Sequence, residues 1–100
     1  MCDIYTGVDE AIYAKTARSM RLHGHVTSLS LENRFWSILT EMAAEEGISM
    51  SRFVTRLYDE CVQKRGEVSN FTSLLRVACT TYLLRREQAS GGVKTKPQTA

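Results

Sequence analysis

Hydroxyl side chains alternate with apolar ones in the segment VTSLSL, residues 26–31, and they are the groups best placed to do chemistry in this chain. Strict alternation is typical of a β-strand with one buried face, because successive side chains of a strand point to opposite sides. The leucines would face the core, and Val26, Ser28 and Ser30 would face solvent. A serine hydroxyl both donates and accepts hydrogen bonds. On a two-stranded ribbon, such side chains can contact base edges in the major groove of DNA.

His23 and His25 stand next to this segment and raise the alternative of a metal site. The two rings would share one side of a strand, but a site with two ligands and no nearby cysteine or carboxylate is a poor one. We therefore expect no metal ion. The three cysteines, Cys2, Cys61 and Cys79, form no CxxC pair. Cys61 and Cys79 fall on apolar helical faces and are predicted to be buried thiols.

Signatures of catalysis are missing from the sequence. It contains no glycine-rich phosphate loop after a strand and no GxSxG or HExxH motif. Cys61 would lie on a buried helix face, and nothing places a histidine base beside it. We expect a protein that is not an enzyme and that needs no cofactor.

The hydrophobic pattern predicts the elements that position these side chains. Residues 18–31 are predicted to form one strand with a bulge or bend at Gly24, where the apolar phase flips. Three helices with apolar stripes are predicted to follow, over residues 32–46, 50–64 and 71–87. The chain then divides into an arm, a folded domain and a disordered polar tail, over residues 1–17, 18–87 and 88–100.

The composition fits one soluble domain. The 100 residues are 43% hydrophobic and 24% charged, and no apolar run approaches the ~20 residues of a membrane span. The net charge is +2, but bases outnumber acids in residues 15–36, which points weakly to an anionic partner. The N-terminus lacks the basic and apolar regions of a signal peptide, and an odd number of cysteines fits the reducing cytoplasm.

A lone strand ahead of three helices has no partner for its backbone N–H and C=O groups. The simplest remedy is antiparallel pairing of the strand with its own copy across a two-fold axis, which closes as a dimer. The helices of both copies would then cover one face of the shared ribbon. The sequence therefore predicts an obligate homodimer.

The segment TSLSLENRFWSILTEMAAEEGISMSRFVTRLYDEC, residues 27–61, resembles the ribbon-helix-helix fold of Arc- and MetJ-type repressors. The segments RSMRLHGHVTSLSLENRFW and NFTSLLRVACTTYLL resemble a subfamily of small bacterial proteins with this fold, in which an N-terminal arm and a third helix are additions. The resemblance covers roughly residues 12–86. It implies a mainly α fold, with one short β-strand that pairs antiparallel across a homodimer and with a third C-terminal helix.

The resemblance also implies roles for individual residues. Three alternating strand residues read bases, here Val26, Ser28 and Ser30. The turn before the second helix holds a DNA phosphate, in agreement with the attraction of anions to helix N-termini. The DNA-backbone contacts expected from the turn and the helix start are Ser49, Met50, Ser51 and Arg52. Those expected from the basic stretch just upstream of the three base-reading residues are Arg18, Arg21, His23 and His25. The alternatives are a merely solvated strand face and a Ser49 that only caps its helix.

These observations predict sequence-specific binding of double-stranded DNA by a homodimeric bacterial transcriptional regulator, a repressor in the cytoplasm, with dimers side by side on repeated half-sites. An alternative is an antitoxin-like or other protein-interaction module that uses the third helix and the tail. A third possibility is that the ribbon serves only to dimerise the chain. Packing, rather than nucleotide stacking, is expected of Trp36, at a dimer or arm contact.

Overall fold

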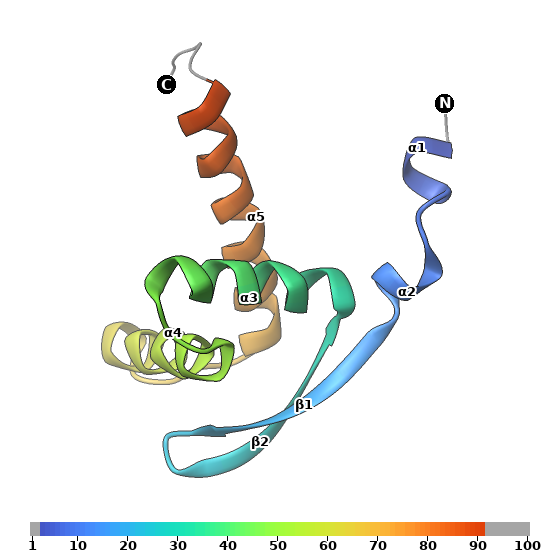
Figure 1. Cartoon of the computed structure of the whole chain (residues 1–100). Coiled ribbons are helices and arrows are strands. Elements are labelled where there is room, and N and C mark those ends of the chain that lie inside the picture. Colours follow the sequence, from blue (N-terminus) through green and yellow to red (C-terminus); the bar gives the residue numbers. More distant parts are fainter. Residues whose placement is uncertain (1–2, 92–100) are drawn as a thin grey trace.

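The computed structural model describes residues 3–91 of the chain. A short arm leads into a two-stranded sheet, and three longer helices follow (Figure 1). The elements are α1 (Asp3–Thr6), α2 (Glu10–Tyr13), β1 (Lys15–Leu22), β2 (His25–Glu32), α3 (Asn33–Glu46), α4 (Met50–Arg65) and α5 (Phe71–Gly91). The predicted fold class, ribbon-helix-helix with an additional C-terminal helix, is confirmed.

The prediction of one bent strand over residues 18–31 is wrong, because the chain forms a β-hairpin there. β1 and β2 pair antiparallel, from Lys15 opposite Glu32 to Leu22 opposite His25. The turn consists of His23 and Gly24, both at positive φ, 55° and 84°. Two central residues with positive φ are typical of the type I′ turn that joins two twisted strands. The phase flip in the sequence therefore marks a chain reversal and not a bulge.

The predicted strand was expected to lack a partner within its own chain, but in the hairpin β2 pairs with β1. Each strand bonds to the other in a sheet of order β1-β2, so one edge of each strand is unpaired in the part of the chain that the structure describes. β1 also begins at Lys15, inside the predicted arm, and α5 ends at Gly91, inside the predicted tail. Residues 92–100 of that tail lie outside the described residues.

Capping residues set the ends of α3 and α4. α3 stops at Gly47, whose φ of 73° lets its N–H bond to the carbonyls of Ala43 and Ala44. This left-handed C-terminal geometry favours glycine. α4 starts at Ser49, whose side chain accepts a hydrogen bond from the Arg52 N–H. The sequence predicted both signals, and the two helices begin and end within one residue of the predicted bounds.

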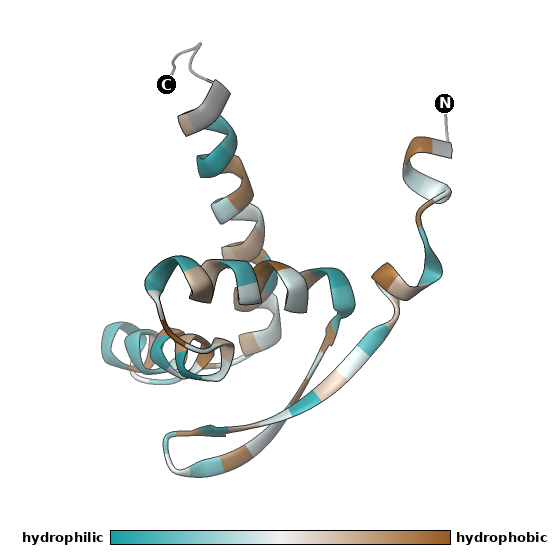
Figure 2. Cartoon of the chain, viewed as in Figure 1, coloured by the Kyte–Doolittle hydropathy of each residue, from teal (hydrophilic) through white to brown (hydrophobic). Residues whose placement is uncertain are grey.

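The hydrophobic core lies between one face of the hairpin and the three long helices. Hydrophobic and hydrophilic residues alternate along the strands, and α4 carries hydrophilic residues over much of its length (Figure 2). The largest side chains with relative exposures below 2% are Leu31, Leu39, Leu75, Val54 and Cys79. The core therefore joins β2, α3, α4 and α5, and α5 belongs to the fold along its first half.

Candidate nucleic-acid interface

The exposed face of the hairpin carries the residues that the sequence singled out. Val26 is 67% exposed, and Ser28 and Ser30 are exposed beside it. Leu29 and Leu31 point the other way, at 6% and 0% exposure. The hairpin thus presents small polar side chains to solvent because its leucines are held in the core.

Strand β1 adds residues to the same face that sequence reasoning missed. Residues opposite each other in an antiparallel pair point to the same side of the sheet. The register places Ala17, Ser19 and Arg21 opposite the three β2 positions on that face. Ala17 and Ser19 were missed because the prediction of one strand over residues 18–31 does not place β1 opposite Ser28 and Ser30, whereas Arg21 was predicted as a contact to the DNA backbone. The outer face of the hairpin, used below in this sense, comprises Ala17, Ser19, Arg21, Val26, Ser28 and Ser30.

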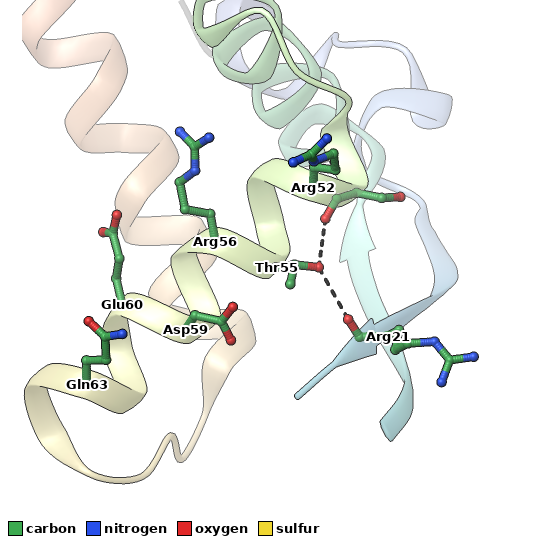
Figure 3. A pocket seen from close by; sticks show the side chains of 8 residues that line it. Arg21, Arg52, Thr55, Arg56, Asp59, Glu60 and Gln63 are labelled. Atoms are coloured by element: carbon green, nitrogen blue, oxygen red, sulfur yellow. Dashed lines mark hydrogen bonds between the residues drawn. The ribbon is translucent and has the colours of Figure 1, made fainter. Parts of the chain in front are cut away.

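The N-terminus of α4 lies next to this hairpin. Thr55 links the two elements, since its hydroxyl lies 3.3 Å from the Arg21 carbonyl and 2.9 Å from the Ser51 carbonyl. An open groove of about 530 Å³ runs along α4 at this contact, lined in part by Ser51, Arg52 and Arg56 (Figure 3). The Arg21 carbonyl points toward α4, while its guanidinium points away from α4 (Figure 3). A sequence pattern does not reveal Thr55, because its role depends on the packing of β1 on α4.

The first turn of α4 combines a capped helix start with exposed polar side chains. The Ser49 side chain bonds to the Arg52 N–H at 3.2 Å, so Ser49 is a helix cap. The first N–H groups of a helix have no intrahelical partner, and the helix dipole is positive there. Ser51 and Arg52 are exposed at this end, whereas the Met50 side chain packs against the core. Met50 can therefore offer only its backbone N–H to a ligand.

The charges along α4 divide the groove into two parts. Arg52 lies in the first turn and has no ion pair within residues 3–91, whereas Arg56 pairs with Glu46 at 3.5 Å. Asp59 and Glu60 line the far part of the groove. The positive part of the groove is thus the part at the helix start, beside the hairpin.

Three predicted backbone contacts lie elsewhere. Arg18 stands opposite Leu29 and places its guanidinium 5.3 Å from the centroid of the Trp36 ring, on the core side of the hairpin. His23 forms the turn, with Nδ1 2.9 Å from Asp59 Oδ1. His25 stands opposite Leu22, so it also belongs to the core side. The structure brings none of these three onto the outer face.

Buried groups behind the interface have structural roles. Trp36 is 3% exposed and donates its indole N–H to the Thr16 carbonyl at 2.8 Å, so it packs on β1 of its own chain. Burial raises the pKa of the Cys79 thiol to about 11, which keeps this group neutral and unreactive. Cys61 is only half-buried, so its predicted burial is incomplete. Among residues 3–91, no group of three or more His, Cys, Asp or Glu side chains is placed to hold a metal ion.

Comparisons with known proteins place these features in context. A family model described as a ribbon-helix-helix domain matches residues 15–83. Among solved structures, an uncharacterized protein from Bordetella pertussis Tohama I is similar, with 44% identity and a TM-score of 0.86. That match covers 94% of this chain and 75% of the other. No curated protein matches the chain. Within the described residues, no helix has the length and hydropathy that a membrane crossing requires.

Proposed function

Because the chain belongs to the ribbon-helix-helix family, we propose that it binds double-stranded DNA sequence-specifically, as a homodimeric transcriptional regulator of the bacterial cytoplasm. The observation that carries this proposal is the outer face of the hairpin, which stands free of the core beside the N-terminus of α4. A β-ribbon fits the major groove, and a helix N-terminus binds phosphate. Both elements would therefore meet one DNA duplex from the same side of the protein.

Three side chains of β2 are proposed to read bases. The hydroxyls of Ser28 and Ser30 can donate to or accept from base edges, and the apolar Val26 suits the methyl group of thymine. Hydroxyl groups discriminate weakly between bases, so DNA shape would contribute to the choice of site.

Contacts to the DNA backbone are proposed for the start of α4 and for β1. Ser51, Arg52 and the free N–H groups of the first turn would hold one phosphate, and Ser49 would keep that turn in shape. Arg21 extends from the outer face without an ion pair inside the described chain, so it is free to reach a phosphate. We do not propose DNA contacts for Arg18, His23 and His25, because these residues lie on the core side of the hairpin or in its turn.

The proposed dimer uses the unpaired edge of β2. Antiparallel pairing of two β2 edges across a two-fold axis would satisfy their free N–H and C=O groups and give a four-stranded sheet. Val26, Ser28 and Ser30 of both copies would then lie in its middle, with β1 on each flank. A two-fold dimer implies a palindromic or repeated site.

The first test replaces Ser28 and Ser30 by alanine together. Sheared genomic fragments from the source organism are retained on the protein at near-physiological salt and sequenced. Wild-type protein should enrich a shared motif, and the double variant should bind with little preference while its fold and dimer persist. Ser37→Ala, an exposed serine on α3, is the matched control and should keep the motif. If the double variant enriches the same motif as the wild type, the proposal that the hairpin reads bases in the major groove is wrong.

Salt dependence supplies a second measurement. Replacing Arg52 by glutamine should weaken binding about equally for all fragments and reduce the slope of log affinity against log salt by about one, since it removes one phosphate contact. A loss of preference at a single base position would instead make Arg52 a base-reading residue.

A further inference from the structure

Exposed large apolar side chains gather in two places outside the hairpin. Four of them lie in the arm, which is defined here as residues 3–14: Ile4, Tyr5, Val8 and Tyr13, at exposures of 70%, 77%, 37% and 57%. Two more lie on α5, Val77 at 60% and Leu84 at 62%. Apolar side chains that cluster on an exposed surface typically mark a contact with another molecule.

The C-terminal part of the arm is attached to Asn33, at the start of α3. The Asn33 N–H donates to the Ala14 carbonyl at 2.8 Å, and its side-chain amide donates to the Ala11 carbonyl at 2.7 Å. Thr16 donates its hydroxyl to the Asn33 side chain. Figure 1 shows the arm leaving α3 at one end and α5 rising beside α3, with the two apart. The apolar side chains of the arm therefore do not lie on α5 of their own chain.

The exposed apolar side chains of α5 form one stripe. Val77 and Leu84 are seven residues apart, so they lie on the same side of the helix, two turns from each other. The opposite side of α5 is used by the fold, since Cys79 is buried and the Tyr82 hydroxyl bonds to Glu41 and Glu45. The stripe is thus the side of α5 that the fold leaves uncovered.

The charges of the two surfaces are complementary. The arm contains Asp3, Asp9 and Glu10 and no base. Of the three arginines of α5, Arg76 pairs with Glu32 and Arg86 pairs with Glu41 of the same chain. Arg85, beside the stripe, has no ion pair within residues 3–91 and is the cation that can meet the acidic arm. Opposite charges around an apolar contact steer association and fix its register.

We propose that the arm of one copy packs on the α5 stripe of a second copy, and that the exchange is reciprocal. Reciprocal exchange buries the exposed apolar side chains of both arms and both α5 helices, and it closes as a two-fold assembly. The partner is a second copy because one chain supplies both complementary surfaces, and these lie apart within that chain (Figure 1). The contact uses neither the outer face of the hairpin nor the start of α4, so it stands independently of DNA binding.

Photo-crosslinking tests this contact in the full chain. p-Benzoylphenylalanine replaces Tyr5, and this protein is mixed with an equal amount of ¹⁵N-labelled chain that carries no photoreactive residue. Irradiation and peptide mass spectrometry then show which chain and which residues are captured. We expect cross-links from the unlabelled arm to α5 peptides of the ¹⁵N chain. The same photoreactive residue at Gln63, exposed on α4, is the matched control and should not capture α5.

Two sets of variants decide the outcome. Val77→Glu with Leu84→Glu should abolish capture by the arm. Glu10→Lys and Arg85→Glu should each reduce capture, and the two together should restore it, a result that does not depend on apolar substitutions that could disturb folding. Capture only within one chain, or capture at sites other than α5, would overturn the proposal. If the protein forms the expected cross-links but retains no DNA fragments, the result contradicts the DNA-binding proposal and leaves the contact between arm and α5 standing.

Discussion

The two faces of the hairpin differ although the same strands carry both. On the core side, Met20, Leu22, Leu29 and Leu31 are at most 6% exposed. On the outer face, neighbouring residues such as Val26 and Ser28 are open to solvent. A one-residue step along either strand therefore moves from a position that stabilises the fold to one that is free to contact a partner. Stability and recognition are separable in this element, and substitutions can measure each one alone.

The largest expected effect is on the core side, at Leu31. This side chain is fully buried, and truncating a buried leucine to alanine costs about 2–5 kcal/mol of unfolding free energy. Leu31→Ala is therefore expected to lower the urea midpoint sharply, as followed by circular dichroism. Ser30→Ala, one residue away on the outer face, is the control and should stay within about 0.5 kcal/mol of wild type. Equal losses in the two variants would show that the two faces are not independent.

The turn that creates both faces should come next in size. Gly24 has a φ of 84°, and a Cβ built there meets nothing within 4 Å, so any penalty comes from the backbone. Gly24→Ala is expected to cost about 1–2 kcal/mol, since left-handed backbone disfavours residues with a Cβ. Asparagine tolerates this conformation better, so Gly24→Asn should recover part of the loss. Thermal unfolding of the two variants measures the difference, and a harmless alanine would argue against the type I′ turn.

The helical part of the fold could be predicted from the sequence because its signals are local. Stripes at helical spacing and the stop and cap at Gly47 and Ser49 lie within a few residues of the boundaries they determine. The hairpin was missed because His-Gly is not one of the residue pairs that type I′ turns prefer, and Gly24 alone fits a bulge as well as a turn. The choice between the two depends on β1 packing against α4, which no short segment reveals.

In the hairpin, the candidate site could be predicted where a period-2 pattern determines which way a side chain points. The orientation of Val26, Ser28 and Ser30 follows from the leucines between them. The positions of Arg18 and His23 do not follow from the sequence pattern, because Arg18 contacts the Trp36 ring and His23 contacts the Asp59 carboxylate, both distant in the sequence. Arg21 reaches the outer face only because β1 turns back beside β2.

Ser49, at the start of α4, is expected to differ from the hairpin residues, because we propose that this one residue affects both stability and DNA binding. Its side chain caps α4, and loss of such a cap costs about 1 kcal/mol. Ser49→Ala should therefore lower the unfolding free energy and also weaken DNA binding, by loosening the turn that we propose to hold a phosphate. Ser51→Ala, exposed two residues later, should affect binding without the loss of stability. Calorimetry and a fluorescence binding assay separate the two. A Ser49→Ala variant with full stability would show that the cap is dispensable.

The smallest effect is expected at Glu32, where the outer side of β2 meets α5. Its carboxylate accepts a hydrogen bond from Arg76 Nε at 3.0 Å, and this bond lowers the pKa of Glu32 below its ordinary value of 4.5. A lowered pKa in the folded state means that the unfolded chain binds the proton first, so stability falls as the pH drops below about 4.5 and through the folded pKa. We expect this loss of stability to be less than about 1 kcal/mol, since both side chains are partly exposed.

Arg76→Gln should reduce the loss of stability at acid pH, measured by urea unfolding between pH 3 and 6 in roughly half-unit steps. Arg34→Gln removes the same charge from a side chain of α3 that has no ion pair within residues 3–91, and it should leave the loss of stability at acid pH unchanged. An unchanged loss of stability at acid pH in Arg76→Gln would mean that the Glu32–Arg76 ion pair contributes nothing measurable to the contact between β2 and α5.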